Sequence, residues 1–116
     1  MSADIHALNE KLRAFAKARD WSQFHSPKNL ACALAVESAE LLENFQWITE
    51  EQSRHLAEPQ KQAVAMEVAD VLLYLLQLTD ALGIDLMSAA NEKLILNERK
   101  YPVERAKGSS KKYTDL

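Results

Sequence analysis

Apolar side chains recur at every third or fourth position through most of the chain, a spacing that predicts amphipathic helices. The pattern predicts four of them: residues 4–19, a second from Pro27 to about Gln46 or Trp47, a third over residues 59–82, and a fourth over residues 86–100. The chain has only 2 glycines, fewer than the turns of a β-sandwich or barrel need. We therefore predict an all-α fold, a bundle of four helices.

Residues suited to helix ends support these boundaries. Ser26 suits an N-cap with proline at the next position, and Asp85 suits the N-cap of the fourth helix. Thr49 and Gln52 have the spacing of a capping box, which predicts a short extra turn of helix. Gly83 stands where a left-handed C-cap residue belongs.

Charge is distributed unevenly along the 116 residues. Residues 1–91 carry seven Lys and Arg against thirteen Asp and Glu, whereas residues 92–116 carry seven against four. The net charge of −3 argues against a nucleic acid polymer as partner. An acidic body could bind cations and a basic end could bind phosphate, although charge alone favours a solvated tail for that end. We predict a helical domain over residues 1–105 and a mobile basic tail over residues 106–116.

Cys32 is the single cysteine, so it forms no internal disulfide, and its apolar neighbours predict a small buried residue. The N-terminus lacks a basic segment followed by an apolar one, and we recognise no apolar stretch of membrane-spanning length. These features predict a cytoplasmic protein with no membrane partner.

A short motif that occurs twice in the chain contains the candidate metal-binding and catalytic residues. Glu37–Leu42 and Glu67–Leu72 both read Glu-x-Ala-acid-apolar-Leu. The 26 residues between Glu40 and Glu67 allow the chain to turn back, which places the third helix antiparallel to the second.

Each copy of the motif places a carboxylate within an apolar stripe of its helix. Glu37 and Glu67 interrupt the stripes, and Glu40 and Asp70 follow one turn later. If the stripes pack together, the four carboxylates converge, which is tolerated only when protons or cations neutralise them. Oxygen ligands favour Mg²⁺, with Mn²⁺ as a substitute. Alternatively, the acids lie at the stripe edges and face water.

Histidine positions disfavour other metals. A di-iron carboxylate bundle uses Glu-x-x-His on two helices, and zinc sites use cysteine or paired histidine. His6, His25 and His55 do not follow a motif acid at that spacing. The donor set points to magnesium and a phosphate substrate.

The acid pairs belong to a larger ordered pattern that resembles a known family. With Glu37-x-x-Glu40, the pattern comprises Arg19-Asp20-Trp21-x-x-Phe24-His25-x-Pro27-x-Asn29-Leu30, Phe45-Gln46-Trp47, Glu67-x-x-Asp70-Val71-Leu72-x-Tyr74-Leu75 and Lys93-x-x-x-Asn97-x-Arg99-Lys100-Tyr101-Pro102. It resembles the all-α nucleoside triphosphate pyrophosphohydrolases of the MazG type, and most closely their dCTP pyrophosphatase branch.

The resemblance implies Mg²⁺-dependent hydrolysis of a (deoxy)nucleoside triphosphate, dCTP or a modified dCTP, to the monophosphate and pyrophosphate, which serves nucleotide pool sanitation. It implies that Glu37, Glu40, Glu67 and Asp70 hold the metal and carry catalysis. One of them would act as base toward the attacking water, and we take Glu40 for this role.

The resemblance also implies substrate contacts. Trp21 and Trp47 would stack the base, with His25, Asn29 and Tyr74 near the base or sugar. It assigns the phosphate tail to the region of the fourth helix that holds Lys93, Asn97, Lys100 and Tyr101. Without the resemblance, core packing would explain the aromatic residues, and a local cap contact would explain Asn29. A solvated helix end would explain the residues of the fourth helix.

Apolar residues on more than one side of the third helix, Leu72, Leu73, Leu76 and Leu78, predict burial against another subunit. The family implies a homotetramer. Two other functions stay open: a dUTP-preferring or broad-specificity pyrophosphohydrolase, and a noncatalytic nucleotide-binding regulatory module.

Overall fold

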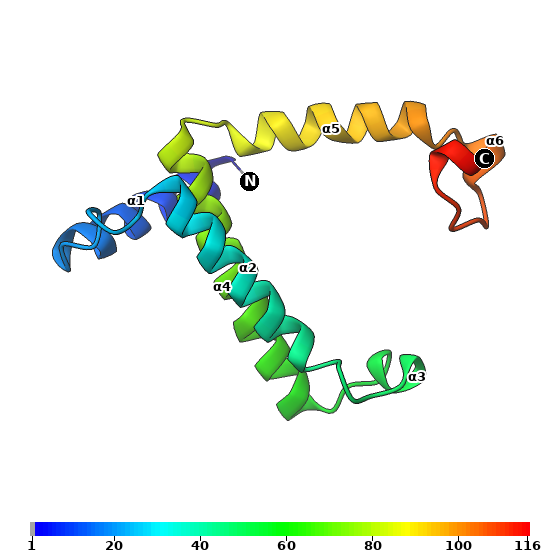
Figure 1. The fold of residues 1–116 in the computed structure, drawn as a ribbon, viewed down its shortest axis with the longest axis horizontal. Coiled ribbons are helices and arrows are strands. Elements are labelled where there is room, and N and C mark those ends of the chain that lie inside the picture. Colours follow the sequence, from blue (N-terminus) through cyan, green and yellow to red (C-terminus); the bar gives the residue numbers. More distant parts are fainter. Residues whose placement is uncertain (1) are drawn as a thin grey trace. The chain divides into compact units, whose positions relative to one another are not determined.

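A computed structural model describes the backbone of residues 2–116 and the side chains of residues 4–116. Within that range the regular elements are helices: α1 (Ser2–Ala18), α2 (Pro27–Glu43), α3 (Glu50–Ser53), α4 (Glu58–Leu82), α5 (Leu86–Lys100), α6 (Val103–Ala106) and the 3₁₀-helix η1 (Tyr113–Asp115) (Figure 1). The prediction of an all-α fold is confirmed, and α1, α2, α4 and α5 correspond to the four predicted helices.

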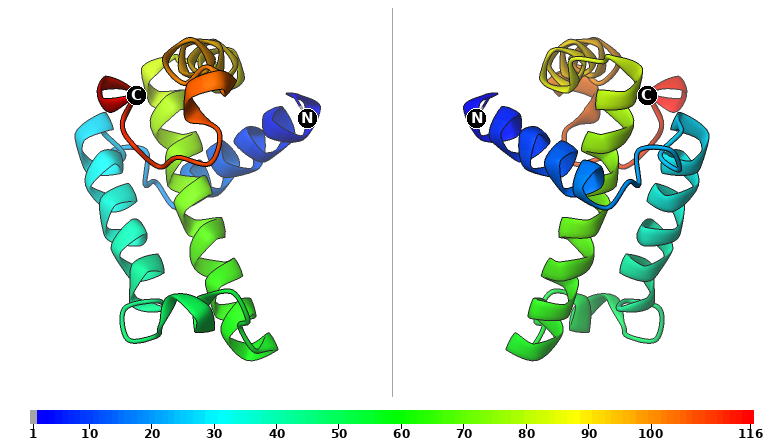
Figure 2. Two further views of the ribbon diagram at one scale, coloured as in Figure 1. Left: turned by 90° about the vertical axis from the view of Figure 1, so that its right-hand side faces the viewer. Right: turned by 90° about the vertical axis from the view of Figure 1, so that its left-hand side faces the viewer.

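The chain forms two compact units, of which the first ends at Ile84 and the second spans Asp85–Leu116. In the first unit, α2 and α4 lie side by side and antiparallel, as predicted, and α1 packs against α4 (Figures 1 and 2). A domain over residues 1–105 and mobility of residues 106–116 stay predictions.

A small core holds the three helices of the first unit together. Leu30 of α2 and Leu76 of α4 are fully buried, and Ala16 of α1 is nearly so. Thr79 is buried beside them, and its hydroxyl donates within α4 to the carbonyl oxygens of Leu75 and Leu76. The core therefore lies toward the C-terminal end of α4.

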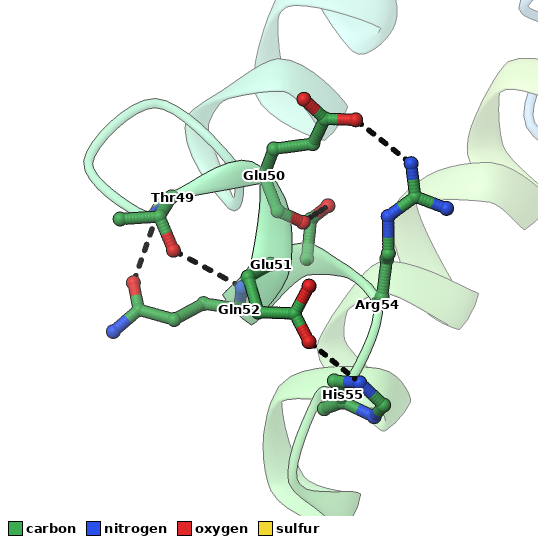
Figure 3. A network of polar contacts seen from close by, with 7 residues as sticks. Thr49, Glu50, Glu51, Gln52, Arg54 and His55 are labelled. Carbon is green, nitrogen blue, oxygen red and sulfur yellow. Dashed lines mark hydrogen bonds and ion pairs between the residues drawn. The ribbon is translucent and has the colours of Figure 1, made fainter.

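The predicted capping residues are confirmed. The side chains of Ser26 and Asp85 each accept a backbone N–H three residues further on, at 3.2 and 3.0 Å. Thr49 and Gln52 exchange two hydrogen bonds in a capping box at the start of α3 (Figure 3). Gly83 has a φ of 66°, which a residue without a Cβ adopts at little cost.

Two sequence-based predictions about α2 are wrong. The helix ends at Glu43 and does not reach Trp47, because the Asn44 side chain donates to the carbonyl oxygen of Glu40, at 3.3 Å, within the last turn. Cys32 is exposed. It lies two residues from Leu30, about 200° around the helix, and so faces away from the core.

Helix α4 is apolar for most of its length. By length and composition alone it could cross a membrane, which corrects the expectation that no such segment exists. The core helix of a soluble protein passes the same test, so one such helix is weak evidence for a membrane. Little of the apolar window is buried in a single chain.

Candidate active site

Facing turns of α2 and α4 bring the predicted carboxylates together. One carboxylate oxygen from each of Glu37, Glu67 and Asp70 lies within 4.8 Å of the others. Glu40 is outside this group of three, but it lies close enough to contribute to the raised pKa of both Glu37 and Glu67. The i, i+3 spacing places both acids of a pair on one helix face, and the antiparallel packing turns the two faces toward each other.

Two of these carboxylates have a buried oxygen that lacks a partner. Oε2 of Glu37 and Oε2 of Glu67 are each inaccessible to solvent and accept no hydrogen bond from the described residues. A buried acceptor without a partner destabilises a fold, and a buried charge does so more strongly. The cluster is therefore poised to take up a proton or a cation.

Burial and like charge shift the titration of the cluster. Burial first, then a hydrogen bond with Glu40 and the neighbouring negative charges, raise the pKa of Glu37 from its usual 4.5 to about 7. Burial also raises the pKa of Glu67, and the charges of Glu40 and Asp70 add to the shift. Both carboxyls resist ionisation until positive charge arrives.

The donor set fits a hard divalent cation. Three carboxylates offer oxygens close enough to share an ion, and two of them have oxygens that no protein donor satisfies. Mg²⁺ and Mn²⁺ prefer such oxygen ligands. Glu37, Glu67 and Asp70 would hold the metal, and a metal contact of Glu40, which lies outside this group of three, stays a prediction.

A cavity of about 390 Å³ adjoins the cluster, because Asp70 contributes to its wall. We call it the main cavity. It lies among α1, the loop after α1 and α4, and it is lined by Leu8, Lys11, Leu12, Phe15, Trp21, His25, Asp70, Leu73, Tyr74 and Gln77. Three predicted substrate residues, Trp21, His25 and Tyr74, meet here.

Aromatic rings form one end of the main cavity. The Trp21 ring contacts Phe15 edge-on at 5.7 Å between centroids and lies 6.2 Å from the ring of His25. Asn29 does not line this cavity; its side-chain amide donates to the carbonyl oxygen of Phe24 at 2.9 Å. That bond ties the loop carrying Trp21 and His25 to the first turn of α2.

Trp47 does not line the main cavity. It lies in the turn after α2, and 86% of its surface is exposed. Its exposure follows from the early end of α2, which leaves the ring on a loop. A base contact for Trp47 stays a prediction.

The predicted phosphate-binding residues belong to the second unit. Lys93, Asn97 and Lys100 lie on α5, and Tyr101 is its C-cap. Tyr101 packs edge-on against Tyr113, and the Lys100 ammonium lies 4.9 Å from the centroid of the Tyr113 ring. Their contact with substrate stays a prediction.

Sequence reasoning missed several residues of the first unit's cavities. Asn9, Leu12 and Gln77 line cavities but were not among the predicted site residues. Gln77 follows Asp70 and Tyr74 at i+7 and i+3, so all three lie on one side of α4. A polar residue on that stripe was the signal that could have identified it.

Comparisons with known proteins agree with this geometry. The sequence model of the MazG-like family matches residues 32–116. The chain is 44% identical over 115 residues to dCTP pyrophosphatase 1 of Mus musculus and 42% identical to that of Homo sapiens. These alignments cover 97% of this chain but 66% of either relative, slightly less than two thirds of its length.

A solved structure agrees as well. A pyrophosphatase from Archaeoglobus fulgidus DSM 4304 superposes with a TM-score of 0.81 at 43% identity, covering 85% of this chain and 93% of that one. Both copies of the acidic motif lie within the residues that the family model matches. The chain belongs to the MazG-like family.

Proposed function

We propose that this chain is a nucleoside triphosphate pyrophosphohydrolase that converts dCTP, or a base-modified dCTP, to the monophosphate and pyrophosphate. The observation that carries the proposal is the carboxylate cluster with unpaired buried oxygens beside an aromatic cavity. The similarity to dCTP pyrophosphatase 1 and to a pyrophosphatase of known structure supports the same reaction. Removal of modified nucleotides from the pool is the role we assign to it.

In this reaction a water oxygen bonds to the α-phosphorus, and the bond from that phosphorus to the α–β bridging oxygen breaks. Glu37, Glu67 and Asp70 would hold Mg²⁺, or Mn²⁺ in its place, which supplies charge neutralisation for the triphosphate and acidifies bound water. Glu40 lies outside the group of three that can share an ion. We assign to it the role of base that accepts the proton of the attacking water.

The main cavity would hold the nucleoside. Its aromatic end, formed by Phe15 and Trp21, offers faces and edges for a flat base. Tyr74 lies one turn along α4 from Asp70 and lines the same cavity, a place suited to a sugar contact. Lys93, Asn97, Lys100 and Tyr101 of the second unit are proposed to bind the phosphate tail.

The enzyme is proposed to work as a homotetramer in the cytoplasm. Large apolar side chains are exposed on α2 and α4, among them Val36, Leu42, Val68 and Leu72. A second copy would cover such a surface. Glu67 and Asp70 in the middle of α4 disfavour a lipid environment for that helix. Sedimentation should give four times the chain mass; an active monomer would contradict the assembly.

The decisive experiment offers each deoxynucleoside triphosphate with Mg²⁺ or with a chelator and identifies the products. We expect pyrophosphate and dCMP in equal amounts, and no turnover without metal. Glu40→Gln should lower kcat by about 10²–10⁴-fold, whereas Glu51→Gln, an exposed glutamate of α3, serves as the matched control and should leave it unchanged. Orthophosphate as product, or binding without turnover, would overturn the proposal.

A further inference from the structure

A second cavity adjoins the main one. It measures about 190 Å³, and Leu12, His25 and Gln77 line both cavities. Asn9 of α1 lines the second cavity but not the main cavity. A base in the main cavity would therefore be bounded on one side by the side chains that the two cavities share.

The amide of Gln77 has a defined orientation. Its Nε2 donates to the carbonyl oxygen of Leu73 at 3.1 Å. Rotating the amide by half a turn would set two carbonyl oxygens against each other, so Nε2 faces Leu73 and Oε1 faces away. Among the described residues no donor bonds to Oε1, which leaves Gln77 as an acceptor at the wall.

Asn9 adds a second acceptor. Its Oδ1 is buried without a hydrogen-bond partner among the described residues, although the residue lines a cavity. Arg13, which also lines the second cavity, is engaged by both carboxylate oxygens of Asp80. The wall thus presents amide oxygens that need a donor.

We infer that Gln77, supported by Asn9, is a specificity-determining residue that selects a base with an exocyclic amino group over one with an oxo group at the same position. This rests on the proposed function for the nucleotide itself. Cytosine presents an N4 amino donor where uracil and thymine present an O4 acceptor. An oxo group would face the amide oxygen of Gln77 and leave that acceptor unpaired, the situation that gives hydrogen-bonding sites their strongest discrimination.

The arrangement along α4 fits this assignment. Asp70, Tyr74 and Gln77 occupy i, i+4 and i+7, so they line one side of the helix over about 10 Å. Asp70 meets the metal end of a nucleotide and Gln77 the opposite end. The helix therefore sets both the phosphate position and the base edge.

The test compares non-hydrolysable α,β-imido analogues of dCTP and dUTP, which differ at the 4-position of the base. Binding is measured by calorimetry with Mg²⁺ for the parent, Gln77→Met, Asn9→Leu and the control Gln62→Met, an exposed glutamine of the same helix. We expect the parent to bind the dCTP analogue at least about tenfold more tightly than the dUTP analogue. Gln77→Met should lower that ratio at least about fivefold by weakening the dCTP analogue alone, with a smaller change in Asn9→Leu and none in Gln62→Met.

Equal binding of the two analogues by the parent, or an equal loss for both in Gln77→Met, would overturn the inference. If Gln77→Met does not fold, as judged by its helical circular dichroism, the inference is tested by the ratio of the two analogue affinities in the parent and by the change in that ratio in Asn9→Leu. Pyrophosphate release separates this result from the broader proposal. Selective binding without turnover refutes the reaction and leaves the inference standing, whereas equal turnover of dCTP and dUTP refutes only the inference.

Discussion

Two acidic residues of α4, Asp80 and Glu67, have pKa values shifted in opposite directions. Asp80 accepts two hydrogen bonds from Arg13 of α1, one of them 2.9 Å long, and this partner lowers the pKa of Asp80. Glu67, about three and a half turns earlier on the same helix, has a raised pKa because it is buried among other acids. The helix is the same, and only the neighbours differ. A carboxylate with a cation beside it stabilises the fold, whereas one without a cation indicates a site for one.

The strongest way to break this comparison is to remove a charge from the cluster. We expect Glu67→Gln to lower metal-dependent turnover by about 10³-fold or more, since the amide cannot replace a charged ligand. The same change should raise the melting temperature of the metal-free protein, because a buried carboxylate is lost. Turnover and thermal unfolding measured on one preparation check both. A variant that loses both activity and stability would contradict the functional role.

The pH dependence should also separate the two groups. The folded-state pKa of Glu37, about 7, exceeds its usual 4.5, so the folded protein binds a proton more tightly than the unfolded chain does. This contribution is fully present below pH 4.5 and is lost as the pH rises through 7. The metal-free protein should therefore melt several degrees higher at pH 5 than at pH 8. Glu37→Gln should reduce the difference, and so should saturating Mg²⁺.

Removing the Arg13 cation beside Asp80 should have a smaller effect. It should lower the stability of the fold, whereas Glu67→Gln should raise it. We expect Arg13→Leu to destabilise the fold only slightly, since the ion pair is partly exposed. In the parent, the depressed pKa of Asp80 gives a stability contribution that is present at neutral pH and lost on acidification below about 4. Thermal melts of both proteins from pH 3 to 7 test this. If Arg13→Leu lost as much stability on acidification as the parent does, this expectation would be wrong.

The smallest effect should come from carboxylates that face water. Glu50 and Glu51 pair with Arg54 and His55 across one turn of the α3 region, with both partners exposed (Figure 3). Replacing either acid with glutamine should change stability by less than about 0.5 kcal/mol. Urea unfolding provides the measurement. A larger loss would mean that exposure does not separate these acids from Glu37 and Glu67.

Local rules determined much of this molecule from sequence alone. The periodicity predicted the four long helices, and the cap residues Ser26, Thr49 and Asp85 marked where helices begin, because capping depends on atoms within three or four residues. The repeated Glu-x-Ala-acid motif also predicted which carboxylates would meet, since each pair occupies one face of its helix.

Tertiary structure decided the properties that depend on distant neighbours. Only packing of α2 against α4 leaves Glu37 and Glu67 with buried unpaired oxygens, and only the fold of α1 over α4 brings Asn9 to the same wall as Gln77. Cys32 is exposed although its neighbours in sequence are apolar. Burial and pKa depend on contacts between segments, which the spacing of residues within one helix does not contain.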